Sequence, residues 1–92
     1  MESVRAHFYI KGLVQGVSYR AWTQNTAQKV GLTGWVRNLE DGRIEAIIEG
    51  DRDRARELIK LIKKGPKLAK VEHIDVCWEE ATGEFDSFEI LR

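Results

Sequence analysis

The chain has 92 residues, of which 42% are hydrophobic and 33% are charged. This length predicts a single domain over residues 1–92, because compact domains usually take about 50–200 residues. No run of sequence approaches the ~20 apolar residues of a membrane span, and the first residues do not open a signal peptide. The single cysteine, Cys77, cannot form an internal disulfide, so we expect a cytoplasmic protein.

The formal charges cancel, with 15 Lys and Arg against 15 Asp and Glu. A neutral chain argues against a dedicated nucleic-acid-binding protein, which normally has a net positive face. The charges are nevertheless unevenly distributed, because residues 3–39 contain five Lys or Arg and no Asp or Glu. Two interpretations stand here: chance variation in a solvated surface, or a site for an anion within this segment.

The first elements follow from hydrophobic periodicity. Alternation over residues 4–11 predicts a strand with one buried face. Residues 12–17 contain two glycines and no clear pattern. A helix is predicted to begin after Ser18, which suits an N-cap, and to end before Gly31, which suits a left-handed position. Its buried stripe is predicted to be Tyr19, Trp22, Thr23, Thr26, Ala27 and Val30.

Residues 35–38 and 44–48 predict two strands, joined by a hairpin at residues 40–42 in which Gly42 takes a positive φ. Asp51 is predicted to cap a second helix that ends at residues 65–66, a Gly-Pro pair. The buried stripe of this helix is predicted to be Ala55, Leu58, Ile59 and Ile62.

Residues 73–78 alternate in the manner of a fourth strand, with Ile74, Val76 and Trp78 on its inner face, and residues 88–90 suggest a short final strand. The order β-α-β-β-α-β with this extra strand predicts an α+β, ferredoxin-like sandwich. In that fold two helices cover one face of an antiparallel sheet. The fold alone does not define the chemistry, because it serves enzymes, RNA-binding domains and regulatory modules.

The candidate site lies where the first strand passes into the first helix, at residues 12–20. Such a turn can aim successive main-chain N–H groups at one point, where the helix end adds about half a positive charge. Arg20 in the first helical turn opposes that charge unless an anion binds between them. Phosphate suits this role, because arginine presents two parallel donors to its oxygens. The alternative is a solvated arginine beside an ordinary glycine turn.

Asn38, at the end of the second predicted strand, is the other candidate. Its carboxamide donates and accepts hydrogen bonds, which suits holding a water molecule in one orientation. An asparagine before a turn is more often only a turn former. The predicted fold, however, can bring this strand end beside the glycine loop and therefore beside Arg20.

Several other chemistries are not expected. A cysteine-dependent phosphatase places its nucleophile six positions before the phosphate-binding arginine, and Val14 stands there. The chain has no nucleotide-binding sequence of the GxxxxGK[ST] type. His7 and His73 belong to separate predicted strands without an acid or cysteine at ligand spacing, so no metal site is expected.

Two sequence blocks resemble those of the acylphosphatase family. Residues 12–20 read GLVQGVSYR and match the signature G-x-V-Q-G-V-x-[FY]-R. Residues 34–42 read GWVRNLEDG and match the second block, G-W-V-x-N-x-x-D-G. The ending at residues 88–90, Phe-Glu-Ile, fits the family's aromatic-x-Ile tendency. The resemblance covers nearly the whole chain, and two blocks in the right order and spacing are a specific match.

The resemblance implies hydrolysis of acyl phosphates to a carboxylate and inorganic phosphate by direct attack of a positioned water, without metal, cofactor or covalent intermediate. It implies that Arg20 and Asn38 are catalytic: Arg20 binds the phosphoryl group and Asn38 orients the water. The phosphate-binding residues, which act through loop amides and the Arg20 side chain, would be Gln15, Gly16, Val17, Ser18, Tyr19 and Arg20. Tyr19 stands where phenylalanine is usual, which leaves both catalytic positions intact.

Two other functions are compatible with this fold. An acylphosphatase-like module can bind a phosphorylated metabolite without hydrolysing it, although the presence of both Arg20 and Asn38 disfavours pure binding. An RNA-binding sheet needs an aromatic RNP1 block, which this sequence lacks. We therefore expect a monomeric enzyme with a small-molecule acyl phosphate as substrate and with no nucleic-acid or membrane partner.

Overall fold

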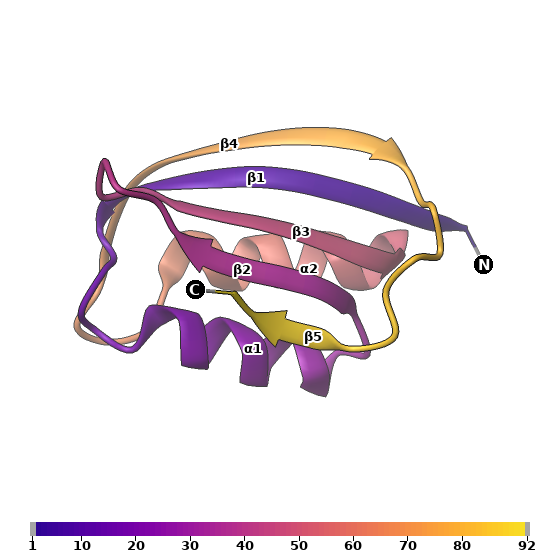
Figure 1. Cartoon of the computed structure of the whole chain (residues 1–92), viewed down its shortest axis with the longest axis horizontal. Helices are drawn as coiled ribbons and strands as arrows, with labels where there is room; N and C mark the ends of the chain where they lie inside the picture. Colours follow the sequence, from indigo (N-terminus) through magenta and orange to yellow (C-terminus); the bar gives the residue numbers. More distant parts are fainter. Residues whose placement is uncertain (1, 92) are drawn as a thin grey trace.

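A computed structural model describes residues 2–91 and shows a five-stranded sheet with two helices on one face (Figure 1). The elements in chain order are β1 (Ser3–Leu13), α1 (Tyr19–Lys29), β2 (Thr33–Asn38), β3 (Ile44–Asp51), α2 (Arg52–Lys64), β4 (Lys70–Glu80) and β5 (Phe88–Ile90). This order confirms the predicted ferredoxin-like α+β sandwich with a short extra strand. Neither helix is long and apolar enough to cross a bilayer, over the residues described.

The strands lie in the order β4-β1-β3-β2-β5. The first four pair antiparallel, as expected, whereas β5 pairs parallel with β2. The sheet is therefore mixed. The cause is visible in Figure 1: β4 ends at the same end of the sheet at which β2 begins, so the chain crosses there and β5 starts beside the start of β2.

The core lies between the sheet and the helices. The buried side chains of α2 are Ala55, Leu58, Ile59 and Ile62, which confirms its predicted stripe. They face the inner side of β1 and β3, where for example Phe8 pairs with Ala46 and both are fully buried. In α1 the buried residues are Tyr19, Thr23 and Ala27, and the rest of the predicted stripe is half-buried.

Two residues illustrate the exposure of a side chain at the edge of the sheet and the close packing of strands in its interior. Trp78 was predicted to face the core; it lies on the helix side, beside Ile59 of α2, but 43% of it is exposed because β4 is one of the two edge strands. Gly34 lies in β2 with φ 137°, where an added Cβ would sit 1.9 Å from the Ile47 carbonyl oxygen. A side chain there would push β2 away from β3, so glycine keeps the strand that carries Asn38 in place.

Candidate active site

The loop between β1 and α1 is anchored by Val14, which is fully buried. Gly16 (φ 76°) and Ser18 (φ 61°) both take left-handed conformations, and Ser18 is the N-cap of α1. The predicted cap position is confirmed, but the Ser18 side chain makes no capping hydrogen bond. The reason is its left-handed backbone, which differs from the extended conformation in which N-cap side chains bond the first turn.

The start of α1 is therefore left with free donors. Within residues 2–91, the first main-chain N–H after Gly16 with a close carbonyl partner is that of Trp22, which donates to the Ser18 carbonyl at 3.0 Å. Unpaired N–H groups at a helix start carry partial positive charge and favour an anion. These unpaired N–H groups support the anion-binding site that was inferred from the glycine loop.

A pocket of about 370 Å³ opens beside these amides. Its lining residues are Val14, Gly16, Ser18, Tyr19, Arg20, Ala21, Asn38 and Ile90. The loop, the end of β2 and the end of β5 meet here, at the left end of Figure 1. Arg20 and Asn38 thus share one pocket. Gln15 and Val17, by contrast, are not among its lining residues, so a phosphate contact from their amides stays a prediction.

Arg20 projects from the first turn of α1 and is half-buried. Its Nη1 donates to the Leu91 carbonyl at 3.5 Å, which is the limit of a hydrogen bond. No Asp or Glu within residues 2–91 forms an ion pair with it. Its charge is therefore uncompensated within the described chain and opposes the positive end of α1, so the pocket favours a bound anion.

Asn38 is the last residue of β2, where its backbone pairs with Ile44 of β3. Its side-chain Oδ1 is buried and has no hydrogen-bond partner within residues 2–91. A buried acceptor without a partner costs about 1–3 kcal/mol, so it is an unusual feature outside functional sites. Asn38 also lines the pocket, so it shares this space with Arg20 and the start of α1.

Tyr19 contributes structure to the site. Its side chain is buried, and its hydroxyl donates to the Ile62 carbonyl in the last turn of α2 at 2.6 Å. Burial raises the pKa of Tyr19 well above its ordinary value. The hydroxyl therefore stays protonated, ties α1 to α2, and holds the loop that precedes α1 against the core.

Several contributors to the pocket were not found by sequence reasoning. Ala21 and Ile90 line it, and Leu91 supplies the carbonyl that contacts Arg20. The Phe-Glu-Ile ending was a signal for β5. The position of β5 could not be predicted in this way. β5 reaches the pocket only through its parallel pairing with β2, and that pairing depends on the path of the chain around the sheet.

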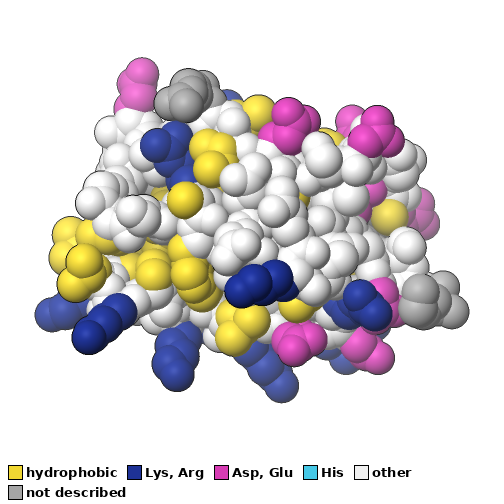
Figure 2. Space-filling view, turned by 90° about the horizontal axis from the view of Figure 1, so that it is seen from below, with side chains coloured by type: hydrophobic (Ala, Val, Ile, Leu, Met, Phe, Trp, Pro, Cys, Tyr) yellow, Lys and Arg dark blue, Asp and Glu magenta, His cyan; other side chains and the backbone are white. Residues whose placement is uncertain are grey.

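The charge around the pocket reflects the acid-free segment 3–39. Among the described residues the pocket lining contains Arg20 and no Asp or Glu, and Figure 2, which views the molecule from below, shows hydrophobic side chains gathered at the left end. This is the end at which the pocket lies in Figure 1. Within residues 2–91, no three His, Cys, Asp or Glu side chains are grouped so that they could hold a metal ion.

A family model described as acylphosphatase matches residues 6–90. The chain belongs to the acylphosphatase family. The predicted resemblance is thereby confirmed, and it extends over the described fold, from β1 to the end of β5.

Individual acylphosphatases agree along the whole chain. An acylphosphatase from a Roseiflexus species is 50% identical over 91 residues, covering 99% of this chain and 98% of the relative. One from Pyrobaculum islandicum is 52% identical over 92 residues, covering 99% and 97%. The crystal structure of the Bacillus subtilis acylphosphatase superposes with a TM-score of 0.93 at 31% identity, covering 97% of this chain and 99% of that one.

Proposed function

We propose that the loop amides and Arg20 bind the phosphoryl group of the substrate, and that Asn38 positions the water that attacks it. The chain is an acylphosphatase, an enzyme that hydrolyses acyl phosphates, and its substrate is a small-molecule acyl phosphate. The roles of the individual residues go beyond family membership and rest on the geometry of the pocket.

In the proposed reaction the water oxygen forms a bond to phosphorus on the side opposite the acyl oxygen. The bond between phosphorus and the acyl oxygen breaks, and its electron pair leaves with the carboxylate. The products are a carboxylate and inorganic phosphate, and the water proton passes to phosphate or solvent. No general acid is needed, because the leaving group is the anion of an acid with a pKa of about 4 and is therefore stable at neutral pH.

Charge stabilisation comes from the first turn of α1. Phosphoryl transfer proceeds through a loose transition state with charge on the equatorial oxygens, so positioning and electrostatics supply most of the catalysis. The amides of Gly16 to Ala21 lack close carbonyl partners within residues 2–91, and the Arg20 guanidinium has only a 3.5 Å contact. Donors that are fixed before the substrate arrives need no reorganisation during the reaction.

The observation that carries the proposal is that Asn38 lines the same pocket as Arg20 and has a buried side-chain oxygen without a partner within residues 2–91. A water held by this oxygen would be polarised and fixed relative to the phosphoryl group. A carboxamide does not remove a proton at neutral pH, so the proposed role is orientation.

The test compares acetyl phosphate with a phosphate monoester such as phenyl phosphate, using wild-type protein, Arg20→Gln and Asn38→Ala. We expect wild-type protein to hydrolyse acetyl phosphate alone, Arg20→Gln to lose turnover and bind inorganic phosphate more weakly, and Asn38→Ala to show a kcat lowered about 10²-fold with unchanged phosphate binding. Normal phosphate affinity in Arg20→Gln would overturn the anion site. Equal hydrolysis of the monoester would indicate a general phosphatase.

The second candidate, a module that binds a phosphorylated metabolite without hydrolysing it, is tested by the same experiment. Tight phosphate binding without turnover of acetyl phosphate would favour it. The buried Asn38 oxygen argues against it, since phosphate binding alone gains nothing from an acceptor left without a partner beside the anion site.

We also propose that residues 1–92 form one domain that acts as a cytoplasmic monomer. A single hydrophobic core joins the strands and both helices, which supports one domain. The thiol of Cys77 is free and exposed, which is typical of a reducing compartment. Sedimentation equilibrium should give a mass of 10.6 kDa, and twice this mass would contradict the monomer.

A further inference from the structure

Gln15 joins the glycine loop to the turn that follows Asn38. Its side-chain Nε2 donates to the Leu39 carbonyl at 2.8 Å and to the Arg43 carbonyl at 3.0 Å. Leu39 directly follows Asn38, and Arg43 closes the turn before β3. Both amide hydrogens of Gln15 are used, and both partners are acceptors only, so its carboxamide has a single orientation.

The sheet itself does not set the distance between these two parts of the pocket. β1, which leads into the loop, and β2, which ends at Asn38, are separated by β3. No strand-to-strand ladder therefore connects the loop with the end of β2. Within residues 2–91, the two bonds from Gln15 are the only hydrogen bonds between residues 14–18 and residues 38–43.

The turn that Gln15 contacts is already well ordered. Leu39 N–H donates to the Arg43 carbonyl at 2.8 Å, and Gly42 N–H donates to the Leu39 carbonyl at 3.2 Å. The Asp41 carboxylate accepts from the Arg43 N–H at 3.0 Å. Gln15 therefore binds two carbonyls of a preorganised turn, so its bonds transmit the position of the turn to the loop.

We propose that Gln15 is a positioning residue that sets the spacing between the phosphate-binding loop and the Asn38 carboxamide. The inference rests on the proposed roles of Arg20 and Asn38. The phosphate contacts lie within one continuous segment, residues 16–21, and survive the loss of Gln15. The placement of Asn38 and its water relative to the phosphoryl group depends instead on the spacing of two segments, so it is lost without Gln15. Gln15 thus acts on the attack step and hence on kcat.

The experiment measures kcat and KM for acetyl phosphate, and the Kd of inorganic phosphate, in Gln15→Met. Methionine has a similar length but lacks both donors. We expect kcat to fall about 10- to 100-fold, the cost of a misplacement of roughly 1 Å. The phosphate Kd should change by less than about threefold, because the substitution impairs the attack step and leaves the phosphate contacts in place. A phosphate Kd that rises as much as kcat falls would overturn the inference.

Gln24→Met is the matched control. Gln24 also donates its side-chain Nε2 to a main-chain carbonyl, that of Phe88 at 3.0 Å, but it does not contact the turn. We expect its kcat to stay near the wild-type value. Thermal denaturation confirms that each variant is folded, and Gln15→Leu, which also lacks both donors and adds no charge, replaces the methionine variant if that one does not fold.

A double-mutant cycle with Asn38→Ala decides whether Gln15 acts through Asn38. In the Asn38→Ala background the water is already unheld, so Gln15→Met should cause no further loss of kcat. The full loss in both backgrounds would show that Gln15 supports the loop independently of Asn38. If Asn38→Ala lowers kcat but Gln15→Met does not, only the inference about Gln15 fails. If Asn38→Ala keeps its activity, the proposed function fails first.

Discussion

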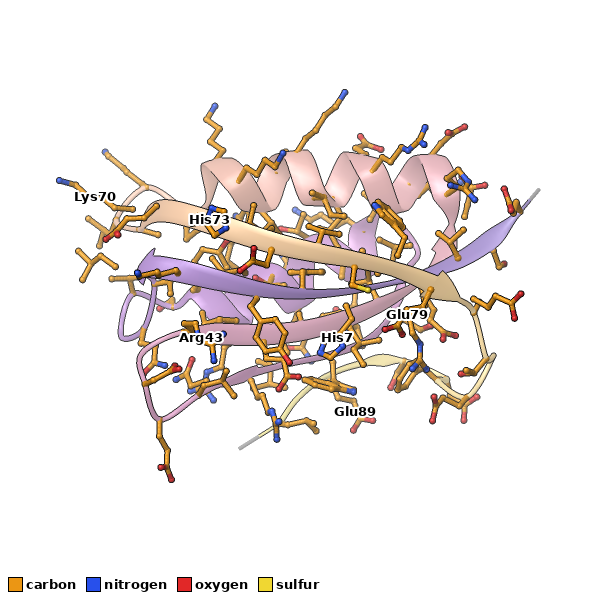
Figure 3. The ribbon with its side chains drawn as sticks, turned by 90° about the horizontal axis from the view of Figure 1, so that it is seen from above. His7, Arg43, Lys70, His73, Glu79 and Glu89 are labelled. Carbon is orange, nitrogen blue, oxygen red and sulfur yellow. The ribbon has the colours of Figure 1, made fainter. Side chains whose placement is uncertain are left out.

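The pocket and the open face of the sheet differ in how far their polar side chains are hydrogen-bonded. In the pocket, Asn38 keeps a buried oxygen without a partner and Arg20 has one 3.5 Å contact, within the residues described. On the open face, which Figure 3 views from above with His7 and Arg43 labelled, charged and aromatic side chains stand close together. There the buried carboxylates of β3 are surrounded by donors.

Glu45 is the clearest case on the open face. The residue is only 6% exposed, and its carboxylate lies 2.7 Å from His7 Nε2, accepts from the Tyr9 hydroxyl at 3.1 Å, and pairs with Arg37 Nη2 at 2.6 Å. Burial alone would raise the pKa of Glu45, but the hydrogen bonds from His7, Arg37 and Tyr9 outweigh it and hold the pKa below its usual value.

Glu49 is held in the same way, four residues further along β3. It pairs with Arg5 Nε at 2.7 Å and accepts from the main-chain N–H groups of Thr82 at 2.9 Å and Gly83 at 3.0 Å. Burial opposes its ionisation, and these bonds lower its pKa overall. The two β3 carboxylates are thus fully partnered, whereas Asn38 and Arg20 leave hydrogen-bonding capacity free in the pocket where the substrate is expected.

The largest expected effect is the loss of activity when Arg20 in the pocket is replaced. Arg20→Gln should lower kcat/KM for acetyl phosphate about 10³-fold or more, because an arginine that stabilises phosphoryl transfer contributes about that much. The thermal midpoint should stay equal or rise, since Arg20 has no ion pair within residues 2–91 to lose. A variant that unfolds instead would contradict the view that Arg20 is unpaired for function.

Asn38→Ala should have the next largest effect. We expect kcat to fall about 10²-fold, the usual cost of losing one positioned polar group at a reaction centre, while the Kd of inorganic phosphate stays the same. Isothermal titration calorimetry and steady-state kinetics measure the two quantities. Asn25→Ala, on the exposed side of α1, is the control and should leave both unchanged. Normal turnover in Asn38→Ala would remove the proposed water site.

On the open face the expected effect is on stability. Glu45→Gln removes the charge that His7, Tyr9 and Arg37 share, and should lower the free energy of unfolding by about 1–3 kcal/mol. The kcat of the folded variant should stay near wild type. Urea denaturation measures the loss. Glu40→Gln, on the exposed hairpin, is the control and should stay within about 0.5 kcal/mol. A large loss of kcat without loss of stability would contradict the contrast.

The smallest expected effect is the pH dependence of stability. The pKa values of Glu45 and Glu49 are lowered in the folded protein, so between the folded and unfolded values the unfolded chain binds more protons. Their contribution is therefore complete above the unfolded pKa of about 4.3 and is lost as the pH falls through the lower folded values. Urea denaturation between pH 7 and pH 3 should show a decline below about pH 5, shallower in Glu45→Gln. An equal slope in both proteins would contradict it.

Much of the fold was predictable because its signals are local. The stripe of α2, the hairpin at Gly42 (φ 97°) and the left-handed Gly31 (φ 76°) after α1 all follow from periodicity and from the backbone freedom of glycine. The pairing of Arg20 with Asn38 in one pocket was anticipated from the strand order. The exposure of Trp78 was not, because alternation marks a face of a strand but does not say whether the strand lies at an edge.

Contacts between distant segments could not be read from the sequence in this way. Glu45 and Glu49 each follow a buried isoleucine in β3 and resemble solvent-facing positions, yet partners from β1, β2 and the segment before β5 bury them. Gln15 belongs to a recognisable motif, but the carbonyls it binds lie 24 and 28 positions further along the chain. A motif names such residues without saying which way their side chains point.

By itself, the sequence determined the order of the elements, the family and the two candidate residues Arg20 and Asn38, because these depend on short-range periodicity and on two motif blocks. The tertiary structure alone decided the parallel docking of β5, the burial of the β3 carboxylates and the bonds from Gln15 to the turn after Asn38. The physical reason is that a hydrogen bond between distant segments depends on the relative placement of whole strands. That placement is set by the packing of the core and is not encoded in either segment.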